Sequence, residues 1–192
     1  MTNIKWALDP VHSEIDFKIK HLMISTVTGH FNKFNLVAET ETDDFNTAKK
    51  VEFTADISSI DTKHEQRNGH LLSADFFDVE KYPELKFIGK SYKIEDGEGK
   101  ITGELTMHGI TKPITLNVEF GGVVQDPYGQ TKAGFTVTGK LSRKEFGLSW
   151  GAVSETGNVL LSDEVKINAE IQLIKQQAQP VEEKELAEAE NA

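Results

Sequence analysis

The first residues to weigh are those that match a known catalytic motif. Residues Gly147 to Gly151 read Gly-Leu-Ser-Trp-Gly, which fits the G-x-S-x-G pattern of a nucleophilic serine. In α/β-hydrolases the catalytic histidine follows that serine along the chain, whereas the last histidine here is His108. We therefore interpret this segment as a loop of small residues around Trp150.

A second candidate motif begins at His64-Glu65, like the helical zinc motif H-E-x-x-H. Asn68 stands where the second histidine would be, and His70 falls on another face of a helix with ~3.6 residues per turn. The chain has no cysteine, which excludes thiolate ligands, thiol nucleophiles and disulfides. The sequence predicts neither a metal site nor a cofactor.

His21 is the remaining polar candidate, because it continues an apolar face formed by Ile15, Phe17 and Ile19. Two interpretations stay open. It is either a rim histidine that hydrogen-bonds to the backbone, as buried polar groups normally do, or a contact to the head group of a ligand. Paired with a neighbouring carboxylate, His21 would also supply an acid–base pair for an enzyme.

The elements that must position these residues are mainly strands, because apolar and polar residues alternate over many short runs. Asp96-Gly97, His108-Gly109 and the segment from Asp126 to Gly129 separate such runs and predict hairpin turns. About eight strands of this kind predict an all-β fold, either a sandwich or a closed barrel. Glycines within the strands, such as Gly89, Gly103 and Gly139, favour an eight-stranded antiparallel barrel wide enough for one ligand. The expected strands are residues 15–21, 34–38, 51–57, 85–89, 101–107, 114–120, 133–141 and 165–173.

One short helix interrupts the strands. Thr62 and Glu65 have the Thr-x-x-Glu spacing of a capping box, which predicts a helix over residues 63–72. We expect it to cover one end of the barrel as a lid.

Composition and charge limit the partners and the location. The net charge of −10 opposes attraction to nucleic acids and anionic lipids, and no apolar run reaches the ~20 residues of a membrane span. We expect no nucleic-acid partner and no stable membrane insertion. The first residues carry no secretion signal, so we expect a cytoplasmic protein. Residues 176–192 are acidic and predict a disordered tail after one domain of residues 1–175.

Spaced motifs occur along most of the chain: Trp6 to Ser13, Phe17 to Leu22, Gly29 to Phe31, Ser59 to Thr62, Arg67 with His70-Leu71, Asp75 to Asp78, Tyr82-Pro83 with Phe87, Gly103 to Pro113 and Ser142 to Leu148. Together these motifs resemble the YceI-like family of lipocalin-like, polyisoprenoid-binding proteins. The resemblance covers residues 5–174 and implies an eight-stranded barrel with a helical lid that holds an isoprenoid or another long-chain lipid. Asn68 replaces an aspartate that is usual in the family, and the missing secretion signal favours a quinone precursor or fatty-acid derivative as the ligand.

The sequence thus predicts a non-catalytic carrier with an elongated apolar cavity. Arg143 would hold the lipid head at a mouth beside the lid, or else support the fold. A lipid-modifying enzyme and an interaction module with a filled barrel are the alternatives, and homodimer formation is left open. The expected ligand contacts are Phe17, Ile19, His21, Phe31, Phe34, Arg67, Phe76, Phe77, Phe87, Met107, Phe135, Arg143, Phe146 and Trp150.

Overall fold

The computed structural model describes residues 2–151, 156–157 and 159–177, so nearly all of the predicted tail lies outside the described residues. The helices are α1 (Glu65–Leu72) and four short 3-10 turns, η1 (Pro10–His12), η2 (Phe45–Thr47), η3 (Ile57–Ser59) and η4 (Lys144–Phe146). The strands are β1 (Ile4–Leu8), β2 (Glu14–His21), β3 (Ser25–Phe31), β4 (Phe34–Thr40), β5 (Ala48–Asp56), β6 (Ile60–Asp61), β7 (Glu84–Glu95), β8 (Glu98–Met107), β9 (Ile110–Gln125), β10 (Thr131–Ser142) and β11 (Glu164–Lys175).

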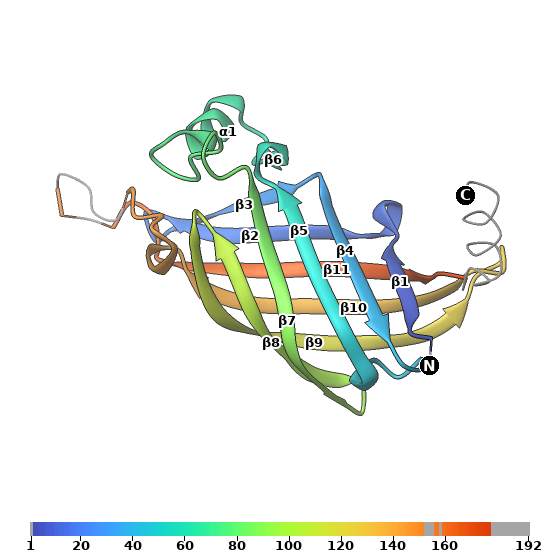
Figure 1. Cartoon of the computed structure of the whole chain (residues 1–192). Helices are drawn as coiled ribbons and strands as arrows, with labels where there is room; N and C mark the ends of the chain where they lie inside the picture. The colour runs from blue at the N-terminus through green and yellow to red at the C-terminus, as the bar shows by residue number, and fades with distance from the viewer. Residues whose placement is uncertain (1, 152–155, 158, 178–192) are drawn as a thin grey trace, which may run out of the picture.

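The strands close into an antiparallel barrel, because β1 at one end of the strand order also pairs with β11 (Figure 1). β1 and β2 lie end to end along β11, and β4 and β3 follow them in the next position. β5 and β6 share the position after that. With β7 to β11 this makes eight positions around the ring, so the predicted eight-stranded barrel is confirmed.

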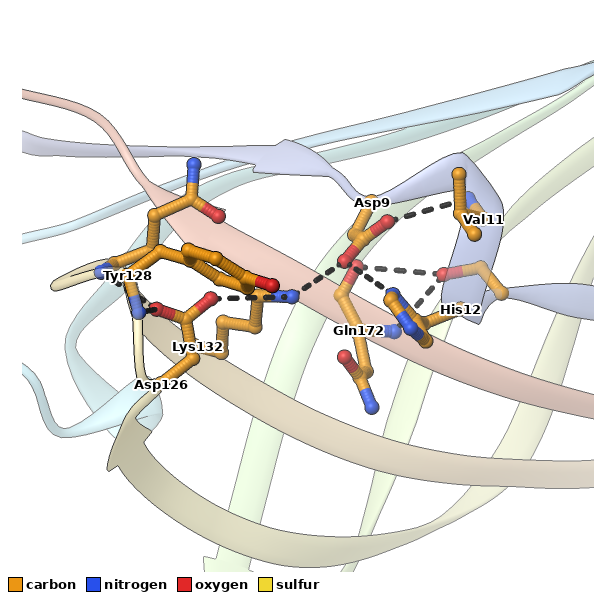
Figure 2. Close-up of polar contacts among 9 residues, drawn as sticks. Asp9, Val11, His12, Asp126, Tyr128, Lys132 and Gln172 are labelled. Atoms are coloured by element: carbon orange, nitrogen blue, oxygen red, sulfur yellow. Dashed lines mark hydrogen bonds and ion pairs between the residues drawn. The ribbon is translucent and has the colours of Figure 1, made fainter.

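The break between β1 and β2 follows from Pro10, which has no backbone N–H to give to a ladder. Asp9 caps the short turn η1 by accepting a hydrogen bond from the Val11 N–H. The carboxylate of Asp9 also accepts hydrogen bonds from His12 and from Lys132, each 2.8 Å long (Figure 2). These contacts tie the break to strand β10.

Two of the predicted turns are two-residue hairpins with both residues at positive φ. Asp96-Gly97 joins β7 to β8 with φ of 53° and 80°, and His108-Gly109 joins β8 to β9 with φ of 54° and 75°. Mirror-image turns of this kind match the twist of the flanking strands. The third predicted turn is also present, because Asp126 accepts hydrogen bonds from the N–H groups of Tyr128 and Gln130.

The lid helix starts later than its predicted boundary, and the predicted capping box is wrong. His64 is the N-cap, since its Nδ1 accepts from the Arg67 N–H at 3.2 Å. The Thr62 hydroxyl is engaged elsewhere, because it donates to Asn68 Oδ1 at 2.6 Å and accepts from Arg67 Nε at 2.8 Å. Asn68 also donates to Asp61, a bond that an aspartate at this position could not make.

The apolar core divides into a cluster beside the lid and a cluster at the opposite end. Phe31, Met107, Phe146 and Leu148 belong to the lid-side cluster. In Figure 1, α1, the β2–β3 hairpin and the segment after β10 lie at one end of the barrel, while the N-terminus and the β9–β10 turn lie at the other. This arrangement gives the barrel two chemically different ends.

Candidate functional site

A cavity of about 260 Å³ lies inside the barrel. Leu71 and Met107 line it on the lid side, and Phe45 and Ile94 line it at the opposite end. The cavity therefore extends along the barrel axis between the two core clusters.

The cavity wall is almost wholly apolar, and its polar residues are engaged or turned outward. Tyr92 donates its hydroxyl to the Gly89 carbonyl at 2.9 Å, and burial raises the pKa of this phenol. Asp16 pairs with His30 at 2.6 Å, and Lys100 is exposed. The space thus suits a flexible hydrocarbon better than a charged molecule.

Four aromatic side chains close the end opposite the lid, and we call them the aromatic floor: Trp6, Phe45, Phe120 and Phe135. Ring centroids of Phe45 lie 4.8 Å from those of both Trp6 and Phe135. The Trp6 indole N–H donates to Thr40 Oγ1 at 2.9 Å, and both residues are fully buried. Phe45 and Phe135 also line the cavity, so the floor forms its inner end.

At the lid end, side chains of α1 and of the segment after it border the cavity. Leu71 of α1 and Phe76 and Phe77 after it line the cavity. His70 and Phe76 pack edge-on, with centroids 5.1 Å apart, and both contact the indole of Trp150. We call these three residues the lid cluster. His70 Nε2 also lies 2.9 Å from Asp75 Oδ2.

Arg143 borders the cavity, but its guanidinium is bound to the backbone. Nε donates to the Ser162 carbonyl at 2.8 Å, and Nη1 donates to the carbonyls of Leu148 and Trp150 at 2.6 and 2.7 Å. Nη2 donates to the Leu161 carbonyl at 3.2 Å. Burial lowers the pKa of Arg143, and the nearby Asp163 carboxylate opposes that shift. This geometry favours the fold-supporting interpretation of Arg143.

The structure separates the predicted contact residues into two sets. Those that line the cavity are Phe17, Phe31, Phe76, Phe77, Phe87, Met107, Phe135 and Arg143. Those that do not line it are Ile19, His21, Phe34, Arg67, Phe146 and Trp150. Ile19 and Phe34, which the alternation of their strands places on the apolar face, do not line the cavity. Whether any residue of the second set contacts a lipid stays a prediction.

The six predicted contact residues that do not line the cavity lie at the ends of strands and at the lid end. Ile19 and His21 follow Lys18, where the paired stretch of β2 and β11 ends. Phe34 follows the break between β3 and β4 and packs on Phe53 with centroids 5.9 Å apart. The remaining three lie at the lid end. Arg67 is exposed, Phe146 is enclosed in the core, and Trp150 belongs to the lid cluster.

Some wall residues were missed by the sequence prediction. Leu116 and Ile171 stand in the apolar alternation of expected strands, so that pattern could have identified them. Phe45 lies in η2, where no periodic pattern marks it as inward-facing. Its position depends on contacts with distant strands.

A family model described as YceI-like domain matches residues 6–173. The chain belongs to the YceI-like family. It is 41% identical over 172 residues to a UPF0312 protein of Staphylococcus aureus (strain USA300), a match that covers 88% of this chain and 95% of that protein.

Solved structures are similar in fold. The YCEI protein of Campylobacter jejuni is 36% identical, with a TM-score of 0.71 over 88% of this chain and 97% of the other. A polyisoprenoid binding domain from Saccharophagus degradans is 17% identical, with a TM-score of 0.64 over 89% of this chain and 98% of the other. Among the described residues of this YceI-like chain, no helix is long and apolar enough to cross a membrane.

Proposed function

We propose that this YceI-like protein binds a long-chain apolar lipid inside its barrel and carries it without changing it chemically. The ligand class is an isoprenoid, a quinone precursor or a fatty-acid derivative. The observation that carries the proposal is the apolar cavity between the aromatic floor and the lid. The Saccharophagus degradans structure, named as a polyisoprenoid binding domain, supports the same ligand class.

The size of the cavity defines how the lipid would be held. A methylene group is close to a water molecule in size, and a water molecule occupies ~30 Å³ in the liquid. A cavity of 260 Å³ therefore holds about nine methylene groups. A lipid of ~20 carbons therefore needs space beyond the enclosed volume. At ~0.3 kcal/mol per heavy atom it would still gain about 6 kcal/mol of binding free energy. Its outer part would pass the lid end, where Leu71, Phe76 and Phe77 border the cavity.

The wall chemistry supports binding without catalysis. General acid–base chemistry needs a titratable side chain within hydrogen-bond reach of the substrate. His21, the histidine that an enzyme mechanism would use, does not line the cavity. Asp16 is paired with His30, and Arg143 is bound to backbone carbonyls. We therefore propose a carrier, not a lipid-modifying enzyme.

We also propose that the lipid-binding unit of residues 1–175 extends to Gln176. Lys175 pairs with Trp6 in the strand register, and the Gln176 N–H donates to the Lys5 carbonyl at 2.8 Å. These contacts close the barrel, so a boundary after Ile174 would remove part of the closure.

A pair of variants on one strand tests lipid binding. Val137 lines the cavity, whereas the next residue, Thr138, is exposed on the outer face. Val137→Phe fills the cavity and should weaken binding of a fluorescent long-chain lipid at least tenfold, while Thr138→Phe should leave it unchanged. Native mass spectrometry of the protein isolated from cells would identify the bound lipid. Equal affinities for both variants and the unmodified protein would contradict binding inside the barrel.

A further inference from the structure

The loop between β2 and β3 exposes three consecutive apolar residues, Leu22, Met23 and Ile24. Met23 is 57% exposed and Ile24 is 82% exposed. Leu22 and Met23 have φ of 52° and 59°, a region in which hairpins normally place Asn, Asp or Gly. The protein therefore holds large apolar side chains in water and in an unfavourable backbone conformation. We call this loop the apolar tip.

The apolar tip is continuous with the lid end of the cavity. The Leu22 N–H donates to the Leu160 carbonyl, and the Leu161 N–H donates to the Gly151 carbonyl, each at 2.8 Å. Gly151 follows Trp150, which packs on His70 of α1. Five of the eight large exposed apolar side chains in the described part of the chain belong to this end: Leu22, Met23, Ile24, Trp150 and Val159.

Lysines lie behind the apolar tip on the outer face of the barrel. Lys18, Lys166 and Lys140 are direct neighbours across β2, β11 and β10, and all three are exposed. We call them the lysine row. Like charges placed opposite each other destabilise a sheet. Among the described residues, one ion pair reaches the row, from Lys140 to Glu164 at 4.0 Å, and at that distance it offsets the repulsion only weakly.

We propose that the lid end docks reversibly on the surface of an anionic lipid bilayer. Met23 and Ile24 enter the boundary between head groups and acyl chains, and the lysine row faces the head groups. An apolar tip with basic residues behind it is complementary to such a surface, which presents negative charge above an apolar layer. This inference deepens the proposed function, because the membrane would be the donor or acceptor of the carried lipid.

The overall net charge of −10 does not decide this interaction. At physiological ionic strength the screening length is about 8 Å, so distant carboxylates contribute little at the lid end. Lys18 lies three residues before His21, or about 10 Å along a strand. A flexible lysine side chain at that distance can reach the head groups once the tip is inserted.

Vesicle co-sedimentation of the full chain tests the apolar tip. The vesicles contain either phosphatidylcholine alone or phosphatidylcholine with phosphatidylserine. Met23→Ser/Ile24→Ser should lower the partition coefficient on the anionic vesicles at least tenfold, because two apolar side chains no longer enter the membrane. The control Val124→Ser/Tyr128→Ser removes exposed apolar groups from the β9–β10 region at the opposite end and should have no effect. Equal losses in both double variants would overturn the proposal.

A second pair of variants tests the lysine row. Lys18→Gln/Lys166→Gln should weaken anionic-vesicle binding by about fivefold for each lysine and should leave neutral-vesicle binding unchanged. The control Lys5→Gln/Lys93→Gln removes two exposed lysines elsewhere. Membrane docking is overturned if the unmodified chain does not bind the vesicles and its apolar tip instead binds another protein. Val137→Phe separates membrane docking from lipid binding in the barrel, because this variant should bind the vesicles normally even though its cavity is filled.

Discussion

At the scale of single residues, Asp9 shows how much one carboxylate organises. Its carboxylate caps η1 and accepts hydrogen bonds from His12 and Lys132 (Figure 2). The Lys132 ammonium also lies 3.6 Å from the Asp126 carboxylate. Burial alone would raise the pKa of Asp9, but the hydrogen bonds from Lys132 and His12 outweigh it and lower the pKa to about 2. The side chain therefore stabilises the fold in its ionised form.

This lowered pKa predicts a loss of stability in acid. The folded-state value of about 2 lies below the ordinary value of 3.8, so the contribution is complete above pH 4 and disappears as the pH falls through 2. Asp9→Asn should lower the free energy of unfolding at pH 7 by about 2 kcal/mol, with a smaller difference from the unmodified protein at pH 2. Urea unfolding across this pH range measures it. The exposed turn variant Asp96→Asn should change stability by less than ~0.5 kcal/mol. A difference for Asp9→Asn that stays constant with pH would contradict the ionised role.

Single residues also mark a limit of sequence reasoning. The sequence predicted that Arg143 and Arg67 lie near the lid, but residue type could not reveal what each guanidinium binds. Arg67 donates to the Thr62 carbonyl and hydroxyl, and Arg143 donates to four carbonyls. A backbone acceptor has no signature in the sequence, because every residue carries one.

At the scale of elements, Arg143 connects the end of β10 to the chain that returns to β11. The carbonyls that it binds belong to residues on both sides of the intervening loop, Leu148 and Trp150 before it and Leu161 and Ser162 after it. Arg143 thereby holds the segment before that loop so that Leu148 faces the cavity and Trp150 faces the lid.

Replacing Arg143 should therefore destabilise this whole segment. Arg143→Ala leaves buried carbonyls without donors and should lower the free energy of unfolding by about 3 kcal/mol or more. Arg143→Lys should recover only part of the loss, because an ammonium lacks the planar fork of five donors. Chemical unfolding measures both, with the exposed neighbour Lys144→Ala as the control. Binding of a fatty acid and of a hydrocarbon of equal length should weaken equally. Selective loss of the fatty acid, with stability unchanged, would instead assign a head-group role.

The sequence predicted the continuous elements better than the interrupted ones. Alternation identified most of the long strands, and the Asp-Gly and His-Gly pairs identified their turns, because period and turn chemistry are local properties. The division of one barrel position between β1 and β2, and of another between β3 and β4, depends on which strands close the ring. The helix cap was misplaced because the Thr62 hydroxyl binds Asn68 and Arg67, a choice made by side-chain packing.

At the scale of the whole molecule, the two barrel ends differ in both closure and chemistry. In the aromatic floor Trp6 and Phe45 are buried and the Trp6 indole donates to Thr40, whereas Phe120 and Phe135 are partly exposed. The lid end carries the lid cluster, the apolar tip and the lysine row. A net charge and an apolar fraction could not predict this asymmetry, because they average over the surface. A ligand chain that enters at the lid end would meet the floor and stop there.

The enclosed volume predicts how affinity depends on chain length. In a series of n-alkanols of 6 to 16 carbons, each added methylene should tighten binding about fourfold, or ~0.8 kcal/mol, until about nine carbons fill the cavity. Beyond that length each carbon lies at the lid cluster and should add less than about twofold, because it is only partly removed from water. Trp150→Ala should extend the steep range, since it opens the lid cluster without altering the floor. Displacement of a fluorescent lipid measures the series. A steep rise through 16 carbons in the unmodified protein would show that the lid moves aside fully, and the floor-to-lid distance would then not limit the ligand.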